Sequence, residues 1–243
     1  MARIFITGSA DGLGQLAAQQ VVHEGHQVVL HARNEPRGHE ALSKVTGAET
    51  VLTGDLSDMA DTKQLAAAVN ASGSFDAIIH NAGVWKASSE SILNINTLAP
   101  YILTCLIQKP KRLVYLGSDM HLDGVYDLPR LKKKSISYSD SKLYVVMLAM
   151  AVARLWPEVY SNAVDPGWVP TKMGGVNASD DLEKGYQTQT WLATSEDAEA
   201  KVSGQYFYHK APSPFGQTAK TEELQDDFLL ACEELTGVRF PRH

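Results

Sequence analysis

Cysteine is scarce in this chain of 243 residues, which has two, Cys105 and Cys232. Each lies in an apolar periodic stretch, and they lack the close, paired spacing of a zinc site or a disulfide framework. We therefore expect two buried, reduced thiols in a reducing compartment, and no metal site.

Long hydrophobic runs and an excess of positive charge are also missing. No stretch approaches the roughly 18 apolar residues that a membrane-spanning helix needs. Acidic residues outnumber basic ones, 28 to 22, and give a formal net charge of −6, which argues against a surface built for nucleic acid. The sequence predicts a cytoplasmic protein that has neither a membrane nor a nucleic acid as its partner.

What the chain does have is a regular alternation of short apolar segments and longer amphipathic ones. Parallel strands need long crossovers, so this alternation predicts a parallel sheet with helices on both faces. No linker or repeat divides the chain, and we expect one α/β domain over residues 1–243, doubly wound and of the Rossmann type. The expected strands are 4–6, 27–30, 51–52, 77–79, 113–116, 159–164 and 205–208, and the expected helices are 13–24, 58–70, 90–107, 139–155 and 222–235.

Three glycines surround the turn between the first strand and the first helix. Backbone N–H groups at a helix start favour an anion, and residues without a Cβ let a pyrophosphate approach closely. The segment therefore predicts the phosphate loop of a dinucleotide site, and an ordinary glycine-rich turn is the alternative. The expected loop residues are Gly8, Ser9, Asp11, Gly12, Leu13 and Gly14.

The end of the second expected strand indicates which dinucleotide binds. An acidic residue there would hold the ribose hydroxyls of NAD, but the sequence has Arg33. A guanidinium suits the 2′-phosphate of NADP, so we expect NADP rather than NAD. Against this, Asp11 disfavours an additional phosphate, and Arg33 would also fit a solvated surface position.

Two later segments complete the expected cofactor site at the carboxyl ends of strands, where open α/β sheets bind ligands. Asp55 and Leu56 follow the third strand, and Asp55 would either accept a hydrogen bond from the adenine amine or cap a helix that begins near Ser57. A small backbone after the fourth strand would border the adenosine ribose, unless it forms a plain turn. That segment is Asn81, Ala82 and Gly83.

Tyr138 and Lys142 are four residues apart at the start of an expected helix, so their side chains share one face. A neighbouring cation favours an ionised phenol, which suits acid–base catalysis on a carbonyl. The spacing alone carries little weight, because Tyr206 and Lys210 repeat it within an expected strand. Ser118 ends the fifth strand, however, and it places the first pair beside the ligand crevice.

Taken in order, these segments resemble the short-chain dehydrogenase/reductase family over nearly the whole chain. The resemblance implies hydride transfer between a nicotinamide cofactor and a carbonyl or alcohol. It assigns Ser118 and Tyr138 to the substrate oxygen, Lys142 to the cofactor ribose beside Tyr138, and Asn96 to a water for proton refill. It also implies that residues 166–171 hold the nicotinamide carboxamide, with contacts from Pro166, Gly167, Val169 and Thr171.

Within the family, residues 118–124, 138–143 and 204–207 resemble the retinol-dehydrogenase-like branch. Two residues depart from the family pattern. His80 stands where many relatives have asparagine, and Gly117 stands where many have a second serine. Neither departure removes a reactive atom, but Gly117 leaves one hydrogen-bond donor fewer near the substrate.

The sequence thus predicts an NADP-dependent oxidoreductase that interconverts a hydrophobic ketone or aldehyde and its alcohol, with Tyr138 as acid and base. Two alternatives are a nucleotide-binding regulator without turnover and a nucleotide-sugar epimerase or dehydratase on the same scaffold. The expected partner is a small molecule. The apolar helices 90–107 and 139–155 also leave a homo-oligomer open.

Substrate contacts are expected from a lid over residues 168–195. Trp85, Trp168, Met173 and Trp191 are candidates for an apolar wall, with ordinary core packing as the alternative for each. His121 would either contact the substrate or lie on a surface loop.

Overall fold

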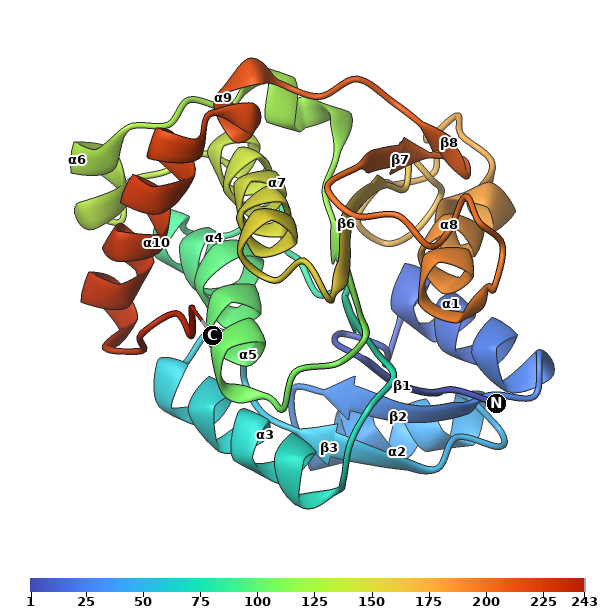
Figure 1. The fold of residues 1–243 in the computed structure, drawn as a ribbon. Coiled ribbons are helices and arrows are strands. Elements are labelled where there is room, and N and C mark those ends of the chain that lie inside the picture. The colour runs from blue at the N-terminus through green and yellow to red at the C-terminus, as the bar shows by residue number, and fades with distance from the viewer. Residues whose placement is uncertain (243) are drawn as a thin grey trace.

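An eight-stranded sheet organises the computed structural model, which describes residues 1–242. Its order is β3-β2-β1-β4-β5-β6-β7-β8, so the chain starts in the middle, winds to one edge and then returns to build the other (Figure 1). The strands are parallel except for β8, which is antiparallel to β7. They are β1 (Arg3–Ile6), β2 (Gln27–Ala32), β3 (Thr50–Thr53), β4 (Ala77–His80), β5 (Arg112–Leu116), β6 (Tyr160–Asp165), β7 (Tyr206–Tyr208) and β8 (Ala211–Pro212). The predicted doubly wound α/β fold is confirmed.

Helices cover both faces of this sheet. One face carries α1 (Gly12–His23), α2 (Glu35–Lys44) and α8 (Leu182–Thr194). The other carries α3 (Met59–Ala71), α5 (Ala99–Leu106), α7 (Tyr138–Leu155) and α10 (Glu222–Thr236). Short connecting elements are α4 (Ser89–Leu93), η1 (Asn94–Leu98), η2 (Asp119–Asp123), α6 (Leu128–Lys132) and α9 (Gln217–Lys220). Within residues 1–242, no helix is both long and apolar enough to cross a membrane.

The central strands are apolar on both faces because each face has its own core. In β1, Ile4 and Ile6 pack in the core under α1 and α8, whereas Phe5 packs in the core under α3 and α7. This alternation follows from the two-residue period of a strand. Of the two free thiols, Cys232 is buried and Cys105 partly buried.

Helix α7 is buried along most of its length, from Asp140 to Val152. It packs on β5 and β6, and the C-terminal helices α9 and α10 pack on its outer side (Figure 1). The apolar residues of α7 are thus buried within one chain, and the homo-oligomer stays a prediction.

Several parts of the helical pattern differ from expectation, since α2, α8 and the short elements η2, α6 and α9 all fall outside the expected helices. The expected helix 90–107 is divided into α4, a π-helical turn η1 and α5. Helix α2 was not expected, because its sequence is mostly polar and buries little beyond Gly38 and Ala41, which leaves few apolar residues to form a pattern. Its start signals are present, however: Asn34 caps the Arg37 N–H at 3.2 Å, and a proline occupies the first turn.

Two buried histidines lie near the ends of β2 and β4, the two strands that flank β1. Both ring nitrogens of His31 form hydrogen bonds with the backbone. Nδ1 accepts from the Gly8 N–H at 2.9 Å, and Nε2 donates to the Gly54 carbonyl at 3.0 Å. His80 stacks on Tyr115, with ring centroids 4.7 Å apart. Burial lowers the pKa of His31 to about 4 and that of His80 to about 3, so both rings are neutral in the folded protein at neutral pH.

These pKa values predict a loss of stability in mild acid. Below about pH 6.5 the unfolded chain binds protons that the folded chain does not, so the unfolding free energy falls as pH drops toward 4. His80→Asn removes one such group and should reduce the slope by up to about 1.4 kcal/mol per pH unit. Urea unfolding at a series of pH values from 7 to 4 measures the slope of the unfolding free energy against pH. The exposed His39, changed to Asn, is the control, and an unchanged slope in His80→Asn would contradict the prediction.

Candidate active site

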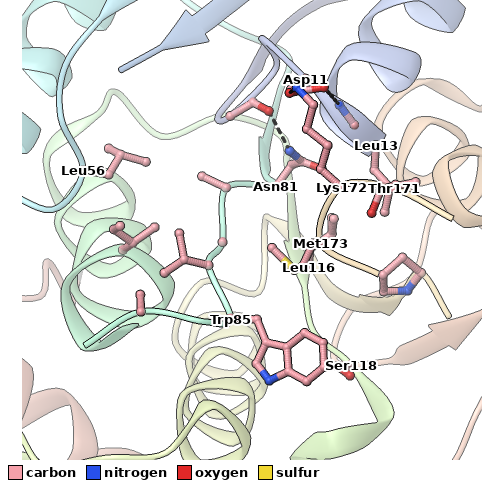
Figure 2. Close-up of a pocket in the computed structure, with 18 of the residues that line it drawn as sticks. Asp11, Leu13, Leu56, Asn81, Trp85, Leu116, Ser118, Thr171, Lys172 and Met173 are labelled. Atoms are coloured by element: carbon pink, nitrogen blue, oxygen red, sulfur yellow. Dashed lines mark hydrogen bonds and ion pairs between the residues drawn. The ribbon is translucent and has the colours of Figure 1, made fainter. Parts of the chain in front are cut away.

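A cleft of about 930 Å³ runs along the carboxyl ends of the parallel strands. Figure 2 shows Asp11, Asn81 and Lys172 toward one end and Trp85 and Ser118 toward the other. Most of the predicted site residues line it: Gly8, Asp11, Gly12, Leu13, Arg33, Asp55, Leu56, Asn81, Ala82, Gly83, Ser118, Tyr138, Lys142, Pro166, Gly167, Val169 and Thr171. Ser9, Gly14 and Asn96 lie behind its wall.

The phosphate loop depends on its glycines for conformation and for close packing. Gly8 has φ +64° and lies so close to Ala82 that a Cβ would stand 2.9 Å from the Ala82 Cα. A side chain at Gly14 would collide with the Asn81 amide and the Gly8 carbonyl. Asp11 caps α1 by accepting from the Gly12 N–H at 2.9 Å. The loop therefore presents backbone at the start of a helix, as an anion site requires.

Polar side chains tie this loop to its neighbours. Ser9 Oγ donates to the Ile6 carbonyl at 2.9 Å and accepts from the His31 N–H at 2.8 Å, so its hydroxyl serves the fold. Asn81 Nδ2 donates to the carbonyls of Thr7 and Gly8 at 3.0 and 3.2 Å. The side chain of Asn81 thus fixes the loop, while its neighbours Ala82 and Gly83 offer backbone to the cleft.

Asp55 forms a local turn with Ser57. Its Oδ1 accepts from the Ser57 N–H at 2.9 Å and the Ser57 hydroxyl at 2.7 Å. The alternative reading of Asp55 as a helix cap is wrong, because α3 begins at Met59 and Asp58 caps it. The contact of Asp55 with adenine stays a prediction.

One end of the cleft gathers more positive charge than the sequence reading found. Arg33 is exposed there, and within residues 1–242 it has no ion-pair partner. Arg37 Nη2 lies 3.3 Å from Asp11 Oδ2, and Lys172 also pairs with Asp11. Burial opposes the ionisation of Asp11, but its contacts with Lys172, the Gly12 N–H and Arg37 outweigh it and lower the pKa.

Arg37 and Lys172 were missed for separate reasons. Arg37 lies in the first turn of α2, a helix that the apolar pattern did not reveal. Lys172 follows the predicted contact Thr171, but its pairing with the phosphate loop spans 161 positions of sequence. Because both cations contact Asp11, this carboxylate disfavours an additional phosphate less than its sequence position suggests.

Tyr138 and Lys142 lie together as predicted, with Lys142 Nζ 5.5 Å from the centre of the Tyr138 ring. Lys142 Nζ donates to the Leu116 carbonyl at 2.8 Å, and burial lowers its pKa to about 8. The expected lowering of the Tyr138 pKa by Lys142 is not found. Burial raises that pKa, and Asp165 and Asp119 raise it further. Tyr138 is therefore a protonated phenol, the form that donates a proton.

Ser118 is held from both sides. Its Oγ caps η2 by accepting from the Met120 N–H at 3.2 Å and donates to Asp119 Oδ1 at 3.0 Å. Its backbone carbonyl accepts from the His121 N–H at 3.0 Å and from His121 Nδ1 at 2.7 Å. The orientation of Ser118 thus rests on Asp119, Met120 and His121.

His121 is neither a substrate contact nor a surface residue, because it is 1 % exposed and lies outside the cleft lining. Its Nε2 accepts from the Gly216 N–H at 3.2 Å, so Nδ1 carries the proton given to Ser118. Its ring packs on Tyr206 at 4.7 Å between centroids. His121 therefore links Ser118 to the C-terminal part of the chain.

The π-helical turn η1 brings Asn96 behind the cleft. Asn96 Oδ1 accepts from the Val84 N–H at 2.8 Å, and Nδ2 donates to the Val84 carbonyl at 2.9 Å and to Ser141 Oγ at 3.0 Å. These bonds fix the segment that precedes Trp85 against α7. The role of Asn96 in positioning water stays a prediction.

The departure at Gly117 has a steric cause. A Cβ there would lie 3.1 Å from Tyr206 Cε2 and 3.4 Å from Val146 Cγ2. The Tyr206 ring therefore crowds this position, and a serine side chain would need the ring to shift by a few tenths of an ångström. The cleft consequently has Ser118 without a second serine beside it.

The candidate apolar wall is three residues. Trp85, Trp168 and Met173 line the cleft and are partly exposed, with the Trp85 ring 6.2 Å from that of Tyr138. Trp191 is absent from the lining and packs edge-on against Phe207 at 5.7 Å. It belongs to α8, which packs on α1. The cleft-facing part of the expected lid is thus its first half, before α8.

Comparison with known proteins identifies the family. The family model described as short chain dehydrogenase matches residues 2–108. An uncharacterized oxidoreductase of Emericella nidulans is 43% identical, with 99% of each chain covered. The short-chain dehydrogenase chyC of Penicillium rubens is 40% identical over 99% of this chain and 100% of its own. This chain belongs to the short-chain dehydrogenase family.

More distant similarities agree with the predicted family and fold. Human retinol dehydrogenase 13 is 26% identical over 98% of this chain and 85% of its own, in line with the resemblance to that branch. A crystal structure from Mycobacterium paratuberculosis, of a putative uncharacterized protein, has a TM-score of 0.81 at 22% identity and covers 99% of this chain and 95% of its own. The predictions of the family and of an oxidoreductase enzyme are confirmed.

His121 gives a test of how Ser118 is held. His121→Leu removes the Nδ1 donor and should lower kcat about ten- to a hundredfold by misplacing the serine. His121→Asn keeps a donor near the Nδ1 position and should recover most of the rate. The Kd of the cofactor should be unchanged in both variants, because His121 lies outside the cleft lining. Equal kcat in the Leu and Asn variants would show that the bond to Ser118 does not matter.

Proposed function

We propose that this enzyme is an NADP-dependent oxidoreductase that interconverts a hydrophobic ketone or aldehyde and its alcohol, with Tyr138 as acid and base. One observation carries the proposal. The cleft has Ser118, Tyr138 and Lys142 at one end and Arg33 with Arg37 at the other. Family membership supports a nicotinamide cofactor, and the arginines favour its 2′-phosphorylated form.

The residues of the cleft fit such a cofactor. Gly8 and Gly12 have positive φ values of +64° and +53°, and as glycines they place no side chain over the start of α1. Pyrophosphate fits that position, and the exposed Arg33 and partly exposed Arg37 suit a phosphate on the adenosine ribose. Val169 and Thr171 also line the cleft, and the family resemblance expects them to contact the nicotinamide carboxamide.

The chain's own groups supply the proton chemistry. When bound, the reduced cofactor provides the hydride for the carbonyl carbon. Ser118 and Tyr138 donate hydrogen bonds to the carbonyl oxygen, and Tyr138 transfers its phenolic proton to that oxygen as negative charge develops on it. Trp85, Trp168 and Met173 exclude water from the reacting carbon. In alcohol oxidation, the same residues take the proton back.

Lys142 acts on Tyr138 through charge. With a pKa of about 8, its ammonium is mostly protonated at pH 7. A cation 5.5 Å from the ring stabilises the phenolate that remains after proton transfer. Burial and the two carboxylates favour the phenol before transfer, so the charge of Lys142 matters most in the second half of the step.

Tyr138→Phe tests the acid. The change removes one hydroxyl and no packing volume, so we expect kcat to fall at least about a hundredfold while the Kd of the cofactor stays within about twofold. Single-turnover rates and cofactor titration on the same preparation measure both. A kcat within tenfold of the parent would contradict the mechanism.

Arg33→Ala and Arg37→Ala test the cofactor. A charge-assisted contact with a 2′-phosphate contributes about 1.5 to 3 kcal/mol, so each change should raise the Kd for NADPH about ten- to a hundredfold and barely change the Kd for NADH. The exposed Arg239, outside the cleft lining, is the control when changed to Ala. Equal or tighter binding of NADH by the parent protein would exclude a 2′-phosphate site at Arg33.

A further inference from the structure

The substrate end of the cleft holds a carboxylate that the proposed mechanism does not use. Asp119 follows Ser118, begins η2 and lines the cleft. It is exposed, and its Oδ1 accepts a hydrogen bond from the Ser118 hydroxyl at 3.0 Å. Asp119 is therefore within reach of any molecule whose oxygen contacts Ser118.

Each end of the cleft carries charges of both signs, and the carboxylates Asp11 and Asp55 line the phosphate-loop end. The cations Arg33, Arg37 and Lys172 lie around the phosphate loop. At the other end, Lys142 is directed to the Leu116 carbonyl. Asp165 is buried near Asp119, where its Oδ1 accepts from the Gly167 N–H at 2.8 Å. Within the cleft lining, Asp119 is the carboxylate beside Ser118, so an anionic substituent next to the reacting carbon is disfavoured at that point.

The single hydrogen-bond donor of Ser118 Oγ is already engaged. Ser118 Oγ accepts a hydrogen bond from the Met120 N–H, and its hydroxyl donates a hydrogen bond to Asp119. To donate to a substrate oxygen, the hydroxyl has to leave Asp119, and the carboxylate then lacks that donor. A substrate that donates its own hydrogen bond to Asp119 replaces the lost bond, and the Ser118 hydroxyl can then donate to the carbonyl oxygen. With a substrate that lacks such a donor, Asp119 and the carbonyl oxygen compete for the Ser118 hydroxyl.

The geometry also limits where that donor lies. Ser118 Oγ and Asp119 Oδ1 are 3.0 Å apart, so two substrate groups that contact them lie on neighbouring atoms. We propose that the substrate carries a hydroxyl, amide N–H or ammonium group on the atom next to its carbonyl carbon, and that Asp119 accepts a hydrogen bond from it. This inference rests on the proposed function, and it makes Asp119 a specificity-determining residue.

The test compares three ketones of one size: 2-hydroxy-1-phenylethanone, its methyl ether 2-methoxy-1-phenylethanone, and phenylglyoxylate. With NADPH, the parent enzyme should have a kcat/KM for the hydroxy ketone at least about tenfold above those of the other two. Asp119→Ala should bring the hydroxy ketone and the ether within about twofold. Asp119→Asn, which keeps an acceptor without the charge, should retain part of that preference and improve phenylglyoxylate.

Asp123→Ala is the matched control, because Asp123 is an exposed carboxylate of the same short helix that does not line the cleft. It should leave all three kcat/KM values unchanged. The melting temperature of each variant checks folding. The conservative Asn variant keeps the test valid where Asp119→Ala is unstable.

A binding experiment separates recognition from chemistry. Tyr138→Phe loaded with NADP⁺ should bind 1-phenylethane-1,2-diol at least about tenfold more tightly than its 2-methyl ether, and the double variant with Asp119→Ala should lose the difference. Equal Kd values for the diol and the ether would overturn the assignment of Asp119, even where the ketones turn over. Selective binding without turnover by the parent enzyme would support Asp119 and contradict the proposed function.

Discussion

Hydrogen bonds that join the end of β1 to the ends of its two neighbouring strands are the constraint on which this enzyme's cleft depends. His31 at the end of β2 accepts from the Gly8 N–H, and Asn81 after β4 donates to the carbonyls of Thr7 and Gly8. A loop with glycines at its turns has many conformations in the unfolded chain, and these bonds select one. Each is buried or half-buried, so losing it costs about 1–3 kcal/mol and frees the loop that faces the phosphates.

The other end of the cleft follows the same design at β5. The last carbonyl of that strand, at Leu116, receives Lys142, and Ser118 two residues later receives His121. His121 in turn reaches Gly216 near the C-terminal helices. The serine, the tyrosine and the lysine thus come from two elements, and their mutual position depends on backbone carbonyls at a strand end. A rigid sheet edge is a suitable base for groups that must stay within fractions of an ångström of a reactive geometry.

The sequence predicted the sheet because buried parallel strands are continuously apolar, and it predicted Ser118, Tyr138 and Lys142 because their order follows strand ends. It failed where the controlling contact is tertiary. Helix α2 has few apolar residues, and with it Arg37 was missed. The placement of His121 depends on Gly216, 95 positions away. The protonated state of Tyr138 could not be read from its spacing to Lys142, because burial outweighs the nearby ammonium.

The buried ammonium of Lys142 lowers the stability of the fold and serves the proposed chemistry. A lysine that is 6 % exposed and has a pKa lowered to about 8 destabilises the folded state while it is charged, and that cost disappears as pH rises from 8 toward 10.5. Its one hydrogen bond, to Leu116, and the more distant charge of Asp165 do not offset the loss of water around the ammonium. Any ligand whose hydroxyls reach Nζ relieves part of this cost, so binding and the charge of Lys142 strengthen each other. The free-energy cost of the buried ammonium is therefore smaller when the cleft is filled, which is the state in which Tyr138 needs a cation beside it.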